Sequence, residues 1–258
     1  QIIEKQEEKI MIICLSYSKG GVGKTTISAN LARVKDPKTN QYMDLFDLDS
    51  PQNGSYAVTL NANNIGLTVF KTYRADPTKQ TPDNNPVVIA QKNRELIDNI
   101  INEYKGRKDK NIIVDCGGHD SDNIRKVLAV SDIIITPISI SDTEVNDFMN
   151  WNSSIIQNLV KVNKTVKAFV LFNKYHRYEE KDFNELKEFI ETNFPYFKVM
   201  HTTIGERKDY RTSFGQGKGV VELKPNNPAR IEIEELAKEL QKIIAEWREL
   251  MRYGIQFT

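Results

Sequence analysis

Short apolar runs alternate with longer segments of helical periodicity along most of this chain. The runs are bounded by polar or glycine-rich residues, a pattern that predicts buried strands. The predicted strands are 11–17, 41–49, 87–90, 111–115, 132–138, 167–173 and 197–200. The predicted helices are 25–34, 92–104, 120–130, 142–162 and 179–193. Polar, proline-rich residues 75–86 are expected to form a surface loop.

This alternation predicts an α/β fold, with a mostly parallel, twisted sheet that has helices on both faces. A last long helix is expected to begin with Asn227 as its cap and Pro228 at its first position. Its apolar stripe consists of Ile233, Leu236, Leu240, Ile243, Ile244, Trp247 and Met251. The polar face of this helix carries more acids than bases, which favours packing on the sheet over binding to a membrane surface.

A glycine-rich loop, SKGGVGKTT, lies between the first predicted strand and the first predicted helix. Gly20, Gly21 and Gly23 allow a tight turn that aims backbone N–H groups inward, and the positive end of the helix points at the same place. Lys24 supplies a charge to the outer phosphates of a nucleotide, and the Thr25 hydroxyl can ligate Mg²⁺. The loop therefore predicts a P-loop NTPase fold.

The loop departs from the ordinary pattern at its start, where Ser18 and Lys19 replace the expected glycine and its neighbour. This string resembles the deviant Walker A motif of the ParA/MinD family of ATPases. The resemblance implies that Lys19 reaches across a nucleotide-sandwich homodimer, formed on ATP binding, to the phosphates bound by the other subunit. It also implies ATP contacts from Lys19, Gly20, Gly21, Val22, Gly23, Lys24, Thr25 and Thr26. The alternative is a solvated loop lysine.

Two further segments resemble the acidic elements of that family. In FDLDSPQNGS, Asp47 and Asp49 match two acids, and Asp49 would orient the attacking water; an inserted Ser50 shifts the register beyond it. The resemblance makes Lys19, Lys24 and Asp49 the catalytic residues. The alternative for Asp49 is an Asx-type turn.

The second acidic segment is NIIVD, which ends in Asp115 as a Walker B strand does. Thr25, Asp49 and Asp115 are therefore the expected Mg²⁺ ligands. Gly117 and Gly118 would let the following loop move near the γ-phosphate. His119 is interpreted as a loop residue without a metal role.

Asn173 ends the predicted strand 167–173, and the resemblance implies an adenine contact for it; a turn role is the alternative. Residues 204–230 include six bases and only three acids, whereas the whole chain has 36 bases, 35 acids and a net charge of +1. The bases could contact DNA phosphates without reading sequence, or form an ordinary solvated face. They are Arg207, Lys208, Arg211, Lys218, Lys224 and Arg230.

The resemblance covers residues 10–250 and is closest to short ParA-type plasmid and chromosome partition ATPases. It implies a single domain over 1–258, with 1–9 as an N-terminal extension. It also implies Mg-dependent hydrolysis of ATP to ADP and phosphate, non-specific DNA binding, and stimulation by a ParB-like centromere-binding partner. A MinD-like or cargo-positioning ATPase, cycling on a membrane or nucleoid surface, is the alternative, and a non-hydrolysing scaffold is the non-enzyme alternative.

Composition agrees with a soluble globular protein, at 39% hydrophobic and 28% charged residues. Cys14 and Cys116 lie in apolar runs and are expected to be buried free thiols in a reducing compartment. The absence of a CxxC pair and of a long apolar run argues against an iron–sulfur carrier and a membrane span. We expect a cytoplasmic, nucleoid-associated protein with no membrane partner.

Overall fold

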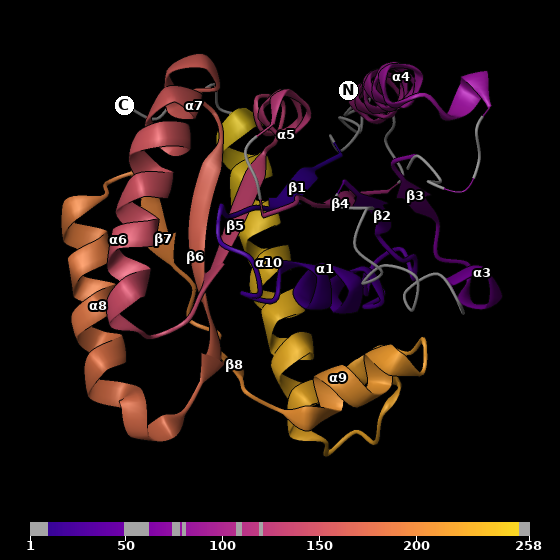
Figure 1. Ribbon diagram of the computed structural model, residues 1–258. Coiled ribbons are helices and arrows are strands. Elements are labelled where there is room, and N and C mark those ends of the chain that lie inside the picture. The colour runs from indigo at the N-terminus through magenta and orange to yellow at the C-terminus, as the bar shows by residue number, and fades with distance from the viewer. Residues whose placement is uncertain are drawn as a thin grey trace, which may run out of the picture.

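The computed structural model describes residues 10–48, 62–73, 78, 81–106, 110–118 and 121–252. Its centre is a parallel sheet with the strand order β3-β2-β4-β1-β5-β6-β7, and β8 pairs with β6 (Figure 1). The strands are β1 Ile12–Leu15, β2 Asp44–Asp47, β3 Val69–Lys71, β4 Ile112–Asp115, β5 Ile133–Ile138, β6 Lys167–Tyr175, β7 Phe197–Val199 and β8 Ile204–Gly205. Every strand pair in the described part of the chain is parallel, which confirms the predicted fold class.

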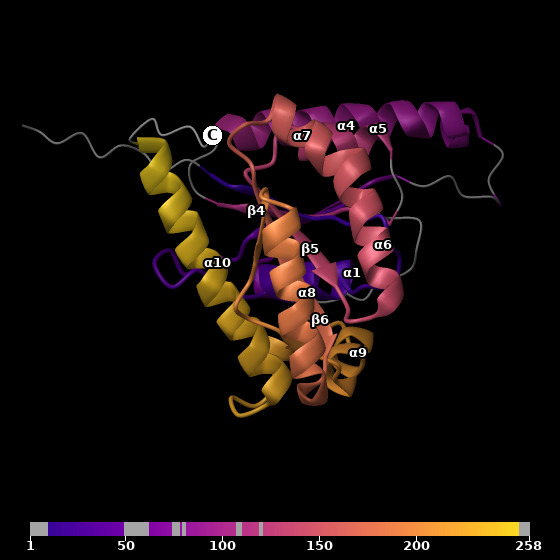
Figure 2. The same cartoon turned by 90° about the vertical axis from the view of Figure 1, so that its left-hand side faces the viewer.

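Helices cover both faces of the sheet (Figures 1 and 2). They are α1 Lys24–Ala32, α3 Ala62–Ile65, α4 Pro86–Gly106, α5 Asp122–Leu128, α6 Asp142–Trp151, α7 Gln157–Val162, α8 Glu180–Asn193, α9 Lys208–Gly215 and α10 Pro228–Arg252. A π-helical turn over 152–156 joins α6 to α7, so the predicted helix 142–162 is continuous but not regular. The bounds of α5 and α8 agree with the prediction to within two residues.

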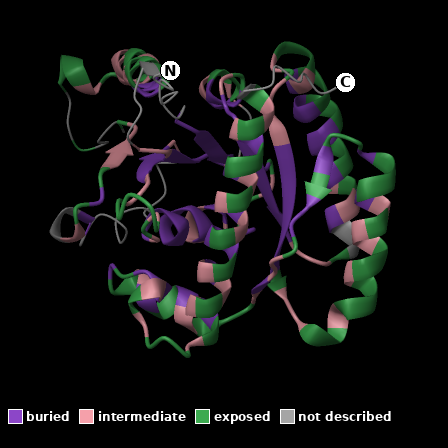
Figure 3. Cartoon of the chain, turned by 180° about the vertical axis from the view of Figure 1, so that it is seen from behind, coloured by how far each residue is buried: buried purple, intermediate pink, exposed green. Residues whose placement is uncertain are grey.

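The two faces of the sheet build two separate cores, because side chains alternate along each strand. Ile12 and Cys14 of β1 pack into the core beneath α4, α5, α6, α7 and α8. Ile13 and Leu15 pack into the core beneath α1, α9 and α10. Strands buried on both faces are continuously apolar, which explains why the runs in the sequence do not alternate. Figure 3 shows the buried strands between helices whose outer sides are exposed.

Helix α10 packs on the sheet with the predicted stripe. Ile233, Leu236, Leu240, Ile244 and Trp247 are buried, Ile243 is partly buried, and Met251 is exposed. The indole Nε1 of Trp247 donates to the carbonyl of Thr165 at 3.0 Å, which ties the helix to the segment before β6. Among the helices that the structure describes, none has both the length and the apolar composition needed to cross a bilayer.

Both cysteines are buried free thiols, as predicted. The pKa of the Cys116 thiol is raised by its contact with Cys14 and by burial. A thiol held in the neutral form is a poor nucleophile and a poor metal ligand, so Cys116 acts in packing.

The strand predicted at 87–90 is wrong, because these residues form the first turn of α4. Pro86 fixes a helical φ at the start of the helix, and the Asn85 Oδ1 accepts the N–H of Val87 at 2.8 Å. Local capping therefore overrides the apolar character of the run, and Val87 is 71% exposed. The prediction missed two short strands: β3 has three residues, all partly buried, and β8 has two.

The cap at the start of α4 gives a stability prediction. Asn85→Ala should lower the free energy of unfolding by about 1 kcal/mol, because it leaves a helix N–H without its side-chain acceptor. Val87→Ala is the control and should change stability by less than about 0.5 kcal/mol, since Val87 is exposed. Urea unfolding followed by circular dichroism measures both. A larger loss for Val87→Ala than for Asn85→Ala would contradict the helical assignment.

Candidate nucleotide-binding site

The phosphate loop connects β1 to α1 at the carboxyl end of the sheet. Gly21 and Gly23 adopt positive φ values of 74° and 91°, the left-handed conformation that glycine tolerates best. The first turn of α1 carries no acidic residue, so the positive end of the helix is not offset by a side chain there. The loop therefore presents backbone N–H groups and a helix N-terminus to the same place, which suits a phosphate.

The two lysines of the loop are held in different ways. Lys24 is buried, and its ammonium donates to the backbone carbonyl of Lys19 at 2.8 Å, back across the loop. Lys19 instead leaves the loop toward α6, where its ammonium lies 2.9 Å from Asp147 Oδ2 and 3.1 Å from Glu144 Oε2. Lys24 therefore lies over the predicted phosphate site, and Lys19 lies at the edge of the loop. Among the remaining loop residues, Val22 is buried and Thr25 and Thr26 are partly exposed.

The end of β6 meets the phosphate loop. The Asn173 side chain is buried and donates to the Val22 carbonyl at 2.7 Å. A Cβ atom at Gly23 would clash with the Asn173 amide, so glycine leaves room for that side chain as well as allowing the positive φ.

A cavity of about 310 Å³ lies beside this contact. The phosphate loop and Asn173 line one side of it, and the other side consists of Ile204 of β8, Arg207 just before α9, and Tyr210 and Phe214 of α9. Because Asn173 pairs with Ile204 across β6 and β8, the cavity unites segments far apart in the sequence. Its apolar walls and convergent polar groups suit a flat heterocycle. Asn173 lines this cavity, which is compatible with the predicted adenine contact; that contact stays a prediction.

Two buried acids end neighbouring strands next to the loop. Asp47 of β2 and Asp115 of β4 are partners in the strand register, and Asp115 is also opposite Leu15 of β1, which precedes the loop. Lys71 lies opposite Asp47 on β3, and burial lowers its pKa while the Asp47 charge opposes that shift. Asp49, predicted as the water-orienting acid, lies outside the described residues.

The Asp115 carboxylate and the Thr25 hydroxyl are hard oxygen donors of the kind that Mg²⁺ prefers. No group of three or more His, Cys, Asp or Glu side chains that could hold a metal occurs in the part of the chain that the structure describes. Mg²⁺ at nucleotide sites usually keeps several waters and binds phosphate oxygens, so one or two protein donors suffice. The donor set therefore fits Mg²⁺ that is bound together with a nucleotide.

The six predicted DNA-binding bases fall into two groups. Arg207 donates to Glu232 Oε1 from Nε at 2.8 Å and from Nη2 at 2.5 Å, and Arg230 donates to Glu234 and to the Leu223 carbonyl. These two side chains hold α10 to the preceding segments. The other four, which are exposed, are Lys208, Arg211, Lys218 and Lys224.

Several residues that organise the site were not predicted from the sequence. Glu232 accepts from Arg207, from the Tyr210 hydroxyl at 2.9 Å and from the Gly205 N–H at 3.2 Å, and it thereby shapes one wall of the cavity. Glu144 and Asp147 hold Lys19. The two acids are three residues apart near the start of a helix, so they lie on one face of it. No pattern in the sequence indicates that this face contacts Lys19.

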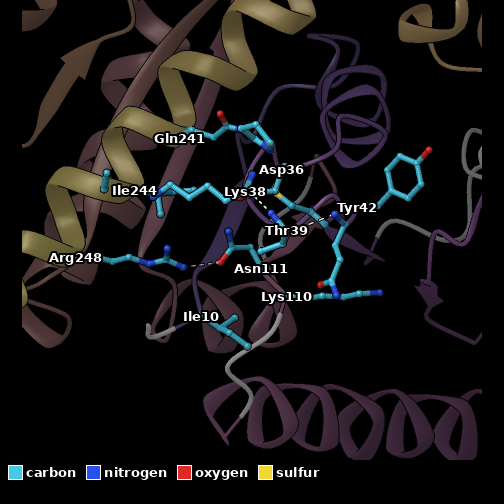
Figure 4. Close-up of a pocket in the computed structure, with 14 residues that line it drawn as sticks. Ile10, Asp36, Lys38, Thr39, Tyr42, Lys110, Asn111, Gln241, Ile244 and Arg248 are labelled. Carbon is cyan, nitrogen blue, oxygen red and sulfur yellow. Dashed lines mark hydrogen bonds between the residues drawn. The ribbon is translucent and has the colours of Figure 1, made fainter. Parts of the chain in front are cut away.

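A second cavity, of about 300 Å³, lies at the opposite, amino end of the sheet (Figure 4). Lys38, Lys110 and Arg248 line it together with apolar residues of α10 and the loop before β2. Lys110 lies 3.4 Å from the buried carboxylate of Asp44, and Arg248 lies 3.5 Å from the Asn111 Oδ1. The cavity has no glycine-rich loop and lies far from the carboxyl strand ends, so the phosphate-loop side is the better candidate site.

Comparisons with known proteins agree with this assignment. A family model described as an AAA domain matches residues 10–85, which include the phosphate loop. An uncharacterised protein of Methanocaldococcus jannaschii is 27% identical over 260 residues, covering 89% of this chain and 97% of its own length.

Solved structures of ParA/MinD-type ATPases share the fold. Cyanothece McdA in an ATP complex has 15% identity and a TM-score of 0.62, with 91% of this chain and 97% of that chain covered. A putative plasmid partition protein from Borrelia burgdorferi, bound to AMPPNP, has 18% identity and a TM-score of 0.61, with 91% and 100% covered. Pyrococcus horikoshii MinD, complexed with Mg-ADP, has 18% identity and a TM-score of 0.62, with 92% and 98% covered. The resemblance to the ParA/MinD family is confirmed, at the level of the fold, over about nine tenths of the chain.

The contact between Gly23 and Asn173 yields a prediction for nucleotide binding. Gly23→Ala should weaken binding of a fluorescent ADP analogue by about tenfold or more. Alanine is strained at the positive φ of this position, and its Cβ would clash with the Asn173 amide. Gly215→Ala is the matched control, since a Cβ there meets nothing within 4 Å. Fluorescence titration of both folded variants measures the effect. Equal affinities would show that the loop does not bind the nucleotide.

Proposed function

We propose that this chain, which has the fold of the ParA/MinD-type ATPases, is an ATP-dependent DNA partition ATPase. It binds ATP and Mg²⁺, dimerises, binds DNA without sequence preference and hydrolyses ATP when a ParB-like centromere-binding partner stimulates it. The observation that carries the proposal is the presence of two lysines with different surroundings in one phosphate loop, Lys24 across the loop and Lys19 at its edge.

The chemistry follows from where charge develops. Phosphoryl transfer spreads negative charge over the γ-phosphate oxygens, so catalysis depends on positioning and on cations. The loop N–H groups and Lys24 would bind the phosphates, and Thr25 and Asp115 would hold Mg²⁺, which neutralises part of that charge. Asp49 would orient the attacking water. Lys19 would add the last cation from the second subunit, so ATP binding and dimerisation would be thermodynamically linked.

The DNA surface is proposed for the exposed cations of α9 and the segment that follows it. Lys208, Arg211, Lys218 and Lys224 are exposed and can reach phosphates. Arg207 and Arg230 already bind acids of α10, so they are expected to support this surface and not to contact DNA. Partition is also the role named for the Borrelia burgdorferi protein with the same fold.

A MinD-like or cargo-positioning ATPase is the second candidate, because MinD and McdA structures match as well as the partition protein does. The exposed charges of α10 are Glu235, Glu246 and Glu249 against Lys238 and Lys242, so this face lacks the basic surplus that favours binding to anionic lipid headgroups. This charge favours DNA over a membrane as the surface that is bound.

The role of Lys19 is tested by dimerisation. Lys19→Ala should abolish ATP-dependent dimerisation and reduce ATP turnover to background, because the partner's phosphates lose their added cation. Lys164→Ala, which removes an exposed lysine before β6, is the control and should behave as the wild type. Analytical ultracentrifugation with ATP and a phosphate-release assay measure both. Unchanged sedimentation and turnover for Lys19→Ala would reject the cross-dimer role.

DNA binding is tested by its dependence on nucleotide and salt. ATP should promote binding to DNA of any sequence and ADP should not, and no condition should promote binding to anionic liposomes. Lys218→Ala should reduce the slope of log affinity against log salt by about 0.9, the value for one lost phosphate contact. Lys161→Ala on α7 is the control, because that exposed lysine lies outside the proposed surface. ATP-dependent liposome binding without DNA binding would favour the MinD-like function.

A further inference from the structure

The cavity at the amino end of the sheet, which we call the amino-end cavity, has a volume of about 300 Å³ (Figure 4). That volume corresponds to about ten water molecules at roughly 30 Å³ each, which is enough for a small organic molecule. The cavity lies between the loop that follows α1, the start of β4 and the last turns of α10. Helix α10 passes the nucleotide side at Glu232, and the sixteen residues from there to Arg248 span about 24 Å of helix. The two cavities are therefore separate sites.

The loop that forms one wall of the amino-end cavity is held in shape by its own hydrogen bonds. Asp36 Oδ1 accepts the backbone N–H of Lys38 at 2.7 Å and that of Thr39 at 3.1 Å, as in an Asx-type turn. The Asp36 N–H donates to the Gln41 carbonyl at 2.9 Å, which closes the loop. The backbone that carries Lys38 is thus fixed without a ligand, and one oxygen of the Asp36 carboxylate is used for that purpose.

Asn111 joins the other two walls to the sheet. Its carbonyl accepts the Asp44 N–H at 3.0 Å, and its Oδ1 accepts the Met11 N–H at 3.0 Å. The same Oδ1 lies 3.5 Å from Nη2 of Arg248, and Figure 4 shows Arg248 extending from α10 toward Asn111. Helix and strands are therefore connected at the cavity, which favours a preformed site over a gap that closes by side-chain movement.

The charged residues that line the amino-end cavity are Asp36, Lys38, Lys110 and Arg248. Lys110 lies 3.4 Å from the carboxylate of Asp44, which is 1% exposed and also accepts from the Tyr104 hydroxyl. The charge of Lys110 therefore balances that buried acid. Lys38 is exposed, Arg248 is partly buried, and the two come from different walls. An anion bound between the loop and α10 would contact both of these cations.

The remaining walls indicate what such an anion is attached to. Ile10 and Ile244 are buried and Met43 is partly buried, and all three line the same cavity. The guanidinium of Arg248 can donate two parallel hydrogen bonds to phosphate, and Lys38 supplies a point charge. A cavity with two cations and an apolar wall suits a ligand that carries a phosphate on an apolar body.

We propose that the amino-end cavity is a second ligand site, which binds a small organic phosphate. Lys38 and Arg248 contact the phosphate, and Ile10, Met43 and Ile244 pack against the apolar body of the ligand. This site is independent of the phosphate loop and of the nucleotide that the loop is proposed to bind.

The test uses phenyl phosphate as the probe, with inorganic phosphate and phenol as its two separate parts. Isothermal titration calorimetry of the full chain measures all three. Phenyl phosphate should bind at least about tenfold more tightly than either part, because only phenyl phosphate engages both the cations and the apolar wall. Failure of phenyl phosphate to bind, or an affinity equal to that of inorganic phosphate, would overturn the proposal.

Variants assign the binding to this cavity. Arg248→Gln should weaken binding of phenyl phosphate by about tenfold, since a charge-assisted hydrogen bond is lost. Lys38→Gln should weaken it by about threefold, and this exposed loop position keeps the fold intact. Lys242→Gln is the matched control, because it removes the same charge from an exposed position of α10 that does not line the cavity. Unchanged affinity in Lys38→Gln, or an equal loss in Lys242→Gln, would reject the site.

The phosphate loop is another place where a phosphate probe could bind, so the titration is repeated with saturating Mg-ADP. The affinity for phenyl phosphate should stay the same, since the two cavities are separate. If Mg-ADP displaces phenyl phosphate, the probe binds at the phosphate loop and the amino-end site is rejected. If Mg-ADP itself does not bind, the proposed nucleotide function is wrong, and the variants of Lys38 and Arg248 still decide whether the amino-end cavity binds phenyl phosphate.

Discussion

Two lysine side chains leave one short phosphate loop, and the chain supplies an acceptor for each of them. Lys24 donates to a carbonyl of the loop, so its charge stays where phosphates are expected. Lys19 binds two carboxylates of α6, one of them fully buried. A buried carboxylate and its cation are tightly linked, because removing either one leaves an uncompensated charge in a medium of low dielectric. The position of α6 relative to the phosphate loop is therefore fixed by electrostatics as well as by the packing of Phe148 and Trp151 into the core beneath it.

The parallel sheet explains why these groups meet. Every described strand runs in the same direction, so the residues at the carboxyl ends of β1, β2, β4 and β6 share one edge. These residues are distant in sequence, but Asp47 and Asp115 end their strands on that edge and Asn173 lies just before the end of β6. The loop gains its shape from the same arrangement: Asn173 can approach Val22 at 2.7 Å only because Gly23 has no side chain. Loop and sheet edge therefore depend on each other.

The sequence was sufficient for the parts of the structure that local patterns determine. Apolar runs predicted most strands of the sheet, and the glycine-rich run predicted the tight loop between β1 and α1, because both signals lie within a few consecutive residues. The run at 87–90 failed for a physical reason: Asn85 and Pro86 start a helix there, and four apolar residues cannot distinguish a strand from a helix turn. Glu144, Asp147 and Glu232 were missed because their importance comes from partners 22 to 128 residues away, which no short pattern reports. The same limit explains why six bases appeared equivalent in the sequence, although two of them bind acids of α10.

Helix α9 connects the nucleotide side of the molecule to its basic surface. Tyr210, Arg211 and Phe214 line the cavity beside Asn173, and Lys208 lies exposed on the same helix. The segment that follows α9 is anchored to α1, since Arg33 donates to the Gly217 carbonyl at 2.8 Å and Asn30 accepts the Val220 N–H at 2.7 Å. Because α1 begins at the phosphate loop, the basic segment is joined to the loop by one helix and to the cavity by another. A group bound in the cavity and a polyanion bound at the surface would then contact the same helix, and Arg211 belongs to both sets of residues, which is the shortest route by which one could change the affinity for the other.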